Sequence, residues 1–230
     1  MESAAMTGPA VQYPNVSPPR PLAPPSVIEV TARLAQRLCH DFMSPASGVI
    51  SGLDLLDDPS AQDLREEAKK HIAESARKLI DSLLFARAAF GSGAELFDNA
   101  QLEGLARGVF SHLRPQLEWA VEAPQLASTP ARVLLNLVQL AGGALAIGGV
   151  AKVTTRIEPG WTAIVVDAIG ERARLHPEVA AGLRGEPMDE GLSGRWVQAW
   201  CLHEVVTESG GVVAAEVRDG GVAFKAALPS

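Results

Sequence analysis

The apolar residues in the first third of the chain recur with the spacing of amphipathic helices. One series follows Ser26 at intervals of three or four positions, and a second runs from the Asp57-Asp58-Pro59-Ser60 cluster to Gly91. At about 100° per residue, each series gathers on one helix face. Ser26 and Glu29 form a capping box, which typically begins a helix. The pattern predicts two long helices that lie antiparallel, because the turn between them is short.

The pattern changes beyond residue 95, where helical spacing alternates with short runs of β-branched residues. Pro159-Gly160 and Asp219-Gly220-Gly221 separate such runs and are typical of turns between antiparallel strands. The predicted helices cover residues 98–111, 129–145 and 195–208, and the predicted strands cover residues 117–121, 152–157, 162–167, 212–217 and 222–228. The fold class is therefore α+β: an antiparallel helical hairpin, followed by an α/β sandwich with a sheet on one side and helices on the other.

These signals divide the chain into three parts, residues 1–25, 26–93 and 94–230. The first part holds seven prolines and few apolar residues, so we expect a disordered tail that buries too little surface to fold. The second part is the hairpin, which on its own would leave an apolar flank in water. We therefore expect two hairpins to pair into a dimeric four-helix bundle, which would bury the flank residues Ile50, Leu55, Ile80 and Leu84.

Composition and charge narrow the possible classes of protein. The chain has 230 residues, of which 47% are hydrophobic, and its formal net charge is −7. The hydrophobic content is that of a globular protein, and the negative charge argues against a general nucleic-acid binder. Two cysteines suit a reducing compartment, and the N-terminus lacks the basic start and apolar core of a secretory signal. We expect a cytoplasmic protein.

An uncharged stretch from Val133 to Ala151 is long enough to cross a bilayer. It contains two polar amides and the pairs Gly142-Gly143 and Gly148-Gly149. A helix, a glycine break and the start of a buried strand account for it better. We therefore expect no association with a membrane.

The candidate chemistry lies on the first predicted helix, at His40 and Asp41. On the helical wheel His40 lies about 180° from the apolar seam of Leu38 and Phe42, so we expect it to face solvent. Asp41 can orient the imidazole or accept its proton, which leaves the other ring nitrogen as a nucleophile. Pro45 in the same helix is expected to bend it. The alternative is a surface histidine without a role.

The other histidines and the cysteines carry weaker signals. Cys39 has no second cysteine or histidine at metal-ligand spacing, so we expect no metal site, and Cys201 is expected to be a buried thiol. Four histidines lack nearby orienting groups in the sequence: His71, His112, His176 and His203. His176 precedes a proline in a predicted loop.

The sequence His40-Asp41-x-x-x-Pro45 resembles the phosphoacceptor box of sensor histidine kinases, His-(Glu/Asp)-x-x-x-Pro. Residues 94–230 resemble a degenerate form of their ATP-binding domain. Residues 134–138 are similar to the asparagine box, but Leu140 replaces the Mg²⁺ ligand of that family. Residues 165–167 resemble the box whose Asp reads adenine, but Ile169 and Glu171 replace its glycines. Residues 191–194 resemble the last glycine loop with altered spacing.

An intact histidine helix with a degraded nucleotide site resembles the ChpT-type histidine phosphotransferases of the alphaproteobacterial cell-cycle phosphorelay, over residues 26–230. The resemblance implies that His40 takes a phosphoryl group from the receiver domain of a hybrid histidine kinase. It then passes the group to the receiver aspartate of response regulators, without binding ATP. The protein would have no cofactor of its own, because the Mg²⁺ would lie in the acidic pocket of the receiver.

A docking receiver must cover the helix turns around His40. We expect its contacts to be one cation, one flexible apolar group and small polar residues, all exposed: Arg37, Met43, Ser44, Ser47 and Ser51. Arg37 could also compensate the charge of the phosphoryl group. Small residues along the next turns, Gly48 and Gly52 among them, are expected to let the partner approach the backbone.

Two other functions remain open. One is an inert receiver-docking scaffold derived from a histidine kinase, which would have no chemical need for the His40–Asp41 pair. The other is an active ATP-dependent kinase, which the substitutions at the nucleotide motifs oppose: Leu140, Ile169 and Glu171.

Overall fold

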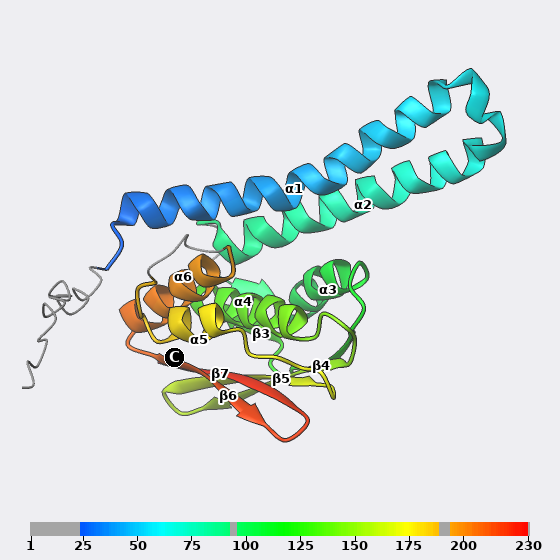
Figure 1. The fold of residues 1–230 in the computed structure, drawn as a ribbon. Coiled ribbons are helices and arrows are strands. Elements are labelled where there is room, and N and C mark those ends of the chain that lie inside the picture. The colour runs from blue at the N-terminus through cyan, green and yellow to red at the C-terminus, as the bar shows by residue number, and fades with distance from the viewer. Residues whose placement is uncertain (1–23, 93–95, 189–193, 230) are drawn as a thin grey trace, which may run out of the picture.

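The computed structural model describes residues 24–92, 96–188 and 194–229. Its N-terminal part is the predicted hairpin: α1 (Val27–Asp57) and α2 (Arg65–Phe90), joined by the 3-10 helix η1 (Pro59–Leu64) (Figure 1). At the start of α1 the Ser26 hydroxyl accepts a hydrogen bond from the backbone N–H of Glu29 at 3.2 Å. The Asp58 carboxylate caps η1 rather than α2, accepting from the backbone N–H of Ser60 at 2.8 Å. The predicted tail falls, up to residue 23, outside the described residues.

The two helices of the hairpin approach closely because small residues of α1 face α2. A Cβ atom added at Gly52 would lie 2.5 Å from Cγ1 of Ile72, and one added at Gly48 would lie 2.5 Å from Oγ of Ser75. The expectation that these glycines open the backbone to a partner is therefore wrong, because α2 already covers them. The helical wheel gives their face correctly, but it cannot say which neighbour occupies it.

The rest of the described chain forms a sheet covered by helices on one face, as the sequence predicts. The five-stranded sheet has the order β2-β4-β5-β7-β6, and within it only β2 and β4 run parallel. β1 and β3 form a separate two-stranded sheet. In order, the elements are β1 (Leu96–Asp98), α3 (Asn99–Phe110), β2 (Gln116–Ala120), β3 (Gln125–Ala127), α4 (Ser128–Ala144), β4 (Val150–Glu158), β5 (Trp161–Ile169), α5 (Pro177–Leu183), α6 (Gly194–Glu208), β6 (Val212–Arg218) and β7 (Gly221–Pro229).

The fold class is confirmed as α+β, and the differences from the predicted elements are small. Four short elements were not predicted: η1, β1, β3 and α5. Each has three to seven residues, which is too short for an apolar period to show. His176, expected in a loop, stands at the N-cap position of α5.

One hydrophobic core joins the base of the hairpin to the helices and the sheet. Phe85 and Ala89 of α2 belong to the same buried cluster as Leu135 of α4 and Val166 of β5. In Figure 1 the helix layer lies between the hairpin and the sheet, while the turn end of the hairpin extends beyond it. The base of the hairpin is therefore held by the same apolar burial that stabilises the sheet.

The uncharged stretch from residue 133 to 151 contributes most of α4 to this core, whereas Ile147 in its turn is exposed. It consists of most of α4, the turn with Gly148 and Gly149, and the start of β4, as predicted. Val133, Leu134 and Leu137 are fully buried against the sheet and the neighbouring helices. Among the described residues, no helix has the length and apolar character needed to cross a membrane.

The close approach of the two hairpin helices can be tested with a pair of matched substitutions. Gly52→Ala should lower the free energy of unfolding by roughly 1–3 kcal/mol, because the new methyl group must displace Ile72. Gly104→Ala in α3 is the control: nothing lies within 4 Å of the new Cβ, so stability should stay equal or rise by up to about 1 kcal/mol. Urea unfolding measures both. Equal stability of the two variants would contradict the packing described.

Candidate functional site

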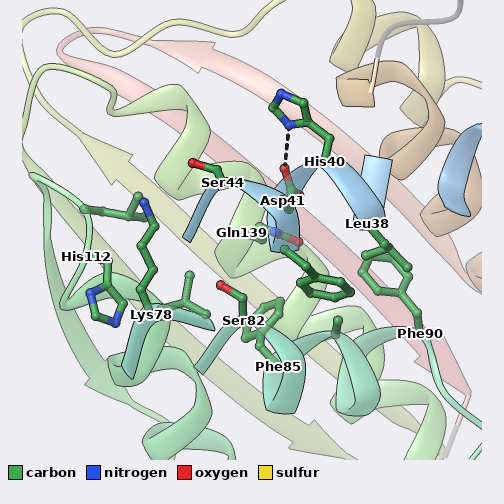
Figure 2. Close-up of a pocket in the computed structure, with 14 residues that line it drawn as sticks. Leu38, His40, Asp41, Ser44, Lys78, Ser82, Phe85, Phe90, His112 and Gln139 are labelled. Carbon is green, nitrogen blue, oxygen red and sulfur yellow. Dashed lines mark ion pairs between the residues drawn. The ribbon is translucent and has the colours of Figure 1, made fainter. Parts of the chain in front are cut away.

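His40 stands out from α1 into solvent with a carboxylate beside it. Its side chain is 85% exposed, as the helical wheel predicts, and its Nδ1 lies 3.5 Å from Oδ1 of Asp41. Figure 2 shows the other ring nitrogen directed away from Asp41. A carboxylate next to Nδ1 favours the tautomer that carries its proton there, which leaves the lone pair of Nε2 free. Nε2 can therefore serve as a nucleophile, and a large partner can reach it without any movement of α1.

Arg37, one turn before His40, connects this site to the C-terminal part of the chain. Its Nε lies 3.5 Å from Oδ2 of Asp41, and its Nη1 donates a hydrogen bond to the backbone carbonyl of Gly194 at the start of α6. Only 16% of the side chain is exposed, so the expectation of an exposed Arg37 is wrong. The sequence could not show this, because Gly194 is 157 positions away.

Burial of Arg37 has an electrostatic consequence. Its pKa lies below the ordinary value of arginine, mainly because burial disfavours the charged guanidinium, while Asp41 acts in the opposite direction. The positive charge of Arg195 lowers the pKa further. The stem of Arg37 packs against Gly194, where an added Cβ would lie 3.3 Å from Cγ of Arg37.

The other residues expected at a docking surface are exposed along one stripe of α1. The side chain of Met43 is 66% exposed, and Ser44, Ser47 and Ser51 are exposed as well. At about 100° per residue, these four positions lie within roughly 60° of His40. The stripe offers a partner one flexible apolar side chain among small hydroxyl groups.

Two grooves flank His40, which lines both. The first has a volume of about 240 Å³ and runs between the hairpin and α3, with Phe85 and Phe90 below and Lys78 and His112 at its side (Figure 2). The second has a volume of about 600 Å³ and separates α1 from the start of α6. It is lined by Arg33, Gln36, Arg37, His40, Asp41, Gly194 and Arg195. The part of the chain that the structure describes has no group of three histidine, cysteine, aspartate or glutamate residues placed to hold a metal.

Leu140, which stands in place of the expected Mg²⁺ ligand, lies at a much smaller pocket of about 100 Å³. Leu140 of α4 lines it, together with Arg37 and Arg195. Asn136 is buried and structural: its Nδ2 donates to the carbonyls of Ala89 at 3.2 Å and Arg132 at 2.9 Å, and its Oδ1 accepts from Gln198 at 3.1 Å. These bonds join α4 to α2 and to α6.

Asp167 does not face this pocket. Its neighbours Val166 and Ala168 are fully buried beneath the helices, so Asp167 lies on the opposite face of the sheet, where it pairs with Arg218 at 3.2 Å. Of the segment similar to the last glycine loop, residues 191–193 fall outside the described residues.

His112 has a partner that the sequence did not reveal. Its Nε2 lies 2.7 Å from Oδ2 of Asp81 in α2, which ties the loop after α3 to the hairpin. The expectation that it lacks an orienting group is wrong, because the partner is 31 positions away.

His203 contacts the carbonyl of Leu183 through Nδ1 at 3.0 Å. Burial raises the pKa of the Cys201 thiol to about 11, so it is a poor nucleophile near neutral pH.

With this geometry in place, comparison with known proteins identifies the family. The family model described as the histidine phosphotransferase C-terminal domain matches residues 99–221, which is more than half of the chain. The chain belongs to the histidine phosphotransferase family. It is also 27% identical over 206 residues to "Protein phosphotransferase ChpT" of Brucella abortus (strain 2308), covering 87% of this chain and 96% of that protein.

One solved structure agrees with this family assignment, and a second match is weaker. One described as a bacterial phosphotransferase superposes with a TM-score of 0.80 at 26% identity, covering 90% of this chain and 98% of the other. The catalytic domain of histidine kinase ThkA, in a nucleotide-free form, gives a TM-score of 0.45 at 18% identity, over 58% and 93% of the two chains. The predicted family and phosphotransferase activity are thus confirmed.

Proposed function

We propose that this phosphotransferase relays a phosphoryl group between receiver domains through His40. The donor is the aspartyl phosphate of a hybrid histidine kinase's receiver, and the acceptors are the receiver aspartates of response regulators. The observation that carries the proposal is the position of His40, 85% exposed on a helix with Asp41 beside Nδ1. A phosphoryl group on a partner's surface can reach only a nucleophile that stands out from its own surface in this way.

The chemistry of the relay needs one bond to form as another breaks. The lone pair of His40 Nε2 forms the N–P bond, and the P–O bond to the donor breaks, so that its electron pair leaves on the donor's carboxylate. The Nδ1 proton stays on the ring, where Asp41 stabilises the added positive charge. In the second step the acceptor's carboxylate attacks phosphorus, and the N–P electron pair returns to Nε2. Such transfers depend mainly on position and charge neutralisation.

The receiver is expected to dock along the exposed stripe of α1. Met43 can fill an irregular groove of the partner, and Ser44, Ser47 and Ser51 permit close approach without the desolvation of a charge. The Mg²⁺ that the resemblance implies belongs to the acidic pocket of the receiver.

Phosphate is expected to reach His40 from receivers and not from ATP. The remnant pocket has a volume of about 100 Å³, whereas ligand pockets typically hold about 300–1,000 Å³. Leu140 supplies no oxygen ligand for a divalent cation. Arg37 lines both this pocket and the larger groove at His40. Its hydrogen bond to Gly194 joins α1 to α6, so the pocket and His40 lie on either side of this contact.

A homodimer through the hairpin is the expected assembly. Apolar side chains are exposed on both helices, with Ile50 at 58% and Ile80 at 55% exposure, and Leu53, Leu83 and Leu84 are also exposed. So many exposed apolar side chains on one hairpin are typical of an interaction surface. Pairing of two hairpins would bury both flanks in a four-helix core and leave the two His40 side chains outside.

The nucleophile can be identified by substitution of two exposed histidines. His40→Ala should abolish acid-labile phosphate uptake from a phosphorylated receiver and leave the fold intact, because the side chain makes no packing contact of note. His71→Ala, on the exposed surface of α2, should label like the wild type. Radiolabel transfer measures both. Label persisting on His40→Ala would refute the proposal, and binding of receivers without any label would favour the inert scaffold.

The docking stripe is tested by a charge placed within it. Ser47→Glu should slow transfer at least tenfold, which corresponds to about 1.4 kcal/mol, because the acidic side chain must be buried against the partner. Gln101→Glu adds the same charge to an exposed position of α3 that lines neither groove, and it should transfer at the wild-type rate. Equal rates for the two variants would place the docking surface elsewhere.

Nucleotide binding can be measured directly. Titration of the full chain with ATP and Mg²⁺ in a calorimeter should give no binding heat, and incubation with labelled ATP should leave His40 unlabelled. The catalytic domain of an active histidine kinase, titrated in parallel, supplies the positive control. Micromolar affinity for ATP would contradict the proposal.

The assembly is tested by light scattering at micromolar concentration. The wild type should give twice the chain mass of 24.2 kDa. Ile50→Asp combined with Ile80→Asp should give the monomer mass, because both charges would be buried at the interface. Ile157→Asp is the matched control, since Ile157 is 56% exposed at the far end of β4 and should leave the dimer intact. A monomeric wild type would exclude the bundle.

A further inference from the structure

Cations are concentrated in the larger of the two grooves beside His40. Among the described residues, its lining includes the guanidinium groups of Arg33, Arg37 and Arg195 and one carboxylate, that of Asp41. The whole chain carries a net charge of −7, so this local excess of positive charge runs against its composition. Two of the arginines come from α1 and the third from the first turn of α6.

The three arginines differ in what already holds them. Arg37 is largely buried and engaged by Asp41 and by the Gly194 carbonyl. Arg195 is exposed and Arg33 is partly exposed, and within the described ranges neither forms an ion pair with a carboxylate. Burial is the main cause that lowers the pKa of Arg37, and the nearby positive charge of Arg195 adds to it in the same direction. Clustered like charges of this kind are unfavourable until an anion lies between them.

We propose that Arg33 and Arg195 form an anion site that holds the phosphoryl group carried by His40. His40 lines the same groove, so a group attached to its Nε2 has these two guanidinium groups as neighbours. A phosphohistidine carries about two negative charges and three acceptor oxygens, and the guanidinium fork is suited to bind such oxygens in pairs. Arg37 is a positioning residue, which holds Asp41 and the start of α6 in place. The inference rests on the proposed function and names further residues of that site.

The same geometry gives the C-terminal part of the chain a role in the transfer. Arg195 lies at the first turn of α6, and α6 is fixed to α1 by the Arg37 hydrogen bond and by packing of Trp196, Val197 and Trp200 against Val30 and Leu34. The sandwich thus brings a cation to a nucleophile on the hairpin. The arginines form no covalent bond during the transfer. They would stabilise the negative charge of the phosphoryl group and leave the reaction steps unchanged.

The experiment compares charge-removing variants of the full chain with two phosphate donors. Arg33→Gln and Arg195→Gln remove a cation and keep a polar stem, Arg195→Lys keeps the charge, and Arg156→Gln is the control on an exposed arginine of β4. The donors are a phosphorylated receiver domain and phosphoramidate, a small donor that needs no docking surface. The rate of His40 labelling is measured with each donor, and the ratio of phosphohistidine to phosphoaspartate is measured at equilibrium with the receiver.

Each Gln variant at Arg33 or Arg195 should lower the rate with both donors by about five- to tenfold and shift the equilibrium toward the receiver by a similar factor. Arg195→Lys should recover most of this loss, and Arg156→Gln should behave as the wild type. A merely structural role would not move the equilibrium ratio in this charge-dependent way.

Three outcomes would overturn the inference. The first is wild-type behaviour of both Gln variants, and the second is a loss with the receiver alone, which would assign the arginines to docking. The third is a wild type that neither donor labels at His40. Labelling by phosphoramidate without labelling by any receiver would instead refute the proposed relay, and the comparison of the variants would still test the anion site.

Discussion

The attachment of the hairpin to the sandwich is the constraint on which the rest of this structure depends. Phe85 and Ala89 of α2 share one apolar core with the sheet, so the base of the hairpin cannot leave without exposing that core. Polar contacts then determine the orientation in which the hairpin packs on the sandwich. Asn136 donates to the Ala89 carbonyl, His112 pairs with Asp81, and Arg37 reaches the start of α6. Together they fix the grooves on either side of His40.

Buried amides of α4 and α6 form part of this attachment. Asn136 of α4 uses its buried amide to join three helices, and Gln198 links it to Gln139 at 2.7 Å. Buried amides are costly unless they are satisfied, and here they are satisfied by one another and by backbone carbonyls. Leu140 fills space in the same region. This region of α4 thus helps to hold the hairpin to the sandwich.

The attachment of the hairpin to the sandwich suits the proposed relay, in which a partner protein must find His40 in a fixed position. Phosphoryl transfer between two large proteins requires that the accepting nitrogen and the charges around it are in place before the encounter. The side chain of His40 is 85% exposed on α1, which leaves room for a large partner beside it. The grooves at its two sides differ in chemistry: one has an aromatic floor and the other is lined by arginines. A receiver that covers His40 therefore meets apolar and cationic surface together.

The sequence by itself determined those features that depend on local period and spacing. The helical hairpin, the main strands, the outward position of His40 and its family motif all follow from residues within a few turns of one another. The tertiary structure decided what depends on distant partners. Arg37 is bound to a carbonyl 157 positions away, His112 meets a carboxylate from another helix, and Asp167 lies on the open face of the sheet. A helical wheel gives the direction of a side chain, but only packing determines what lies there.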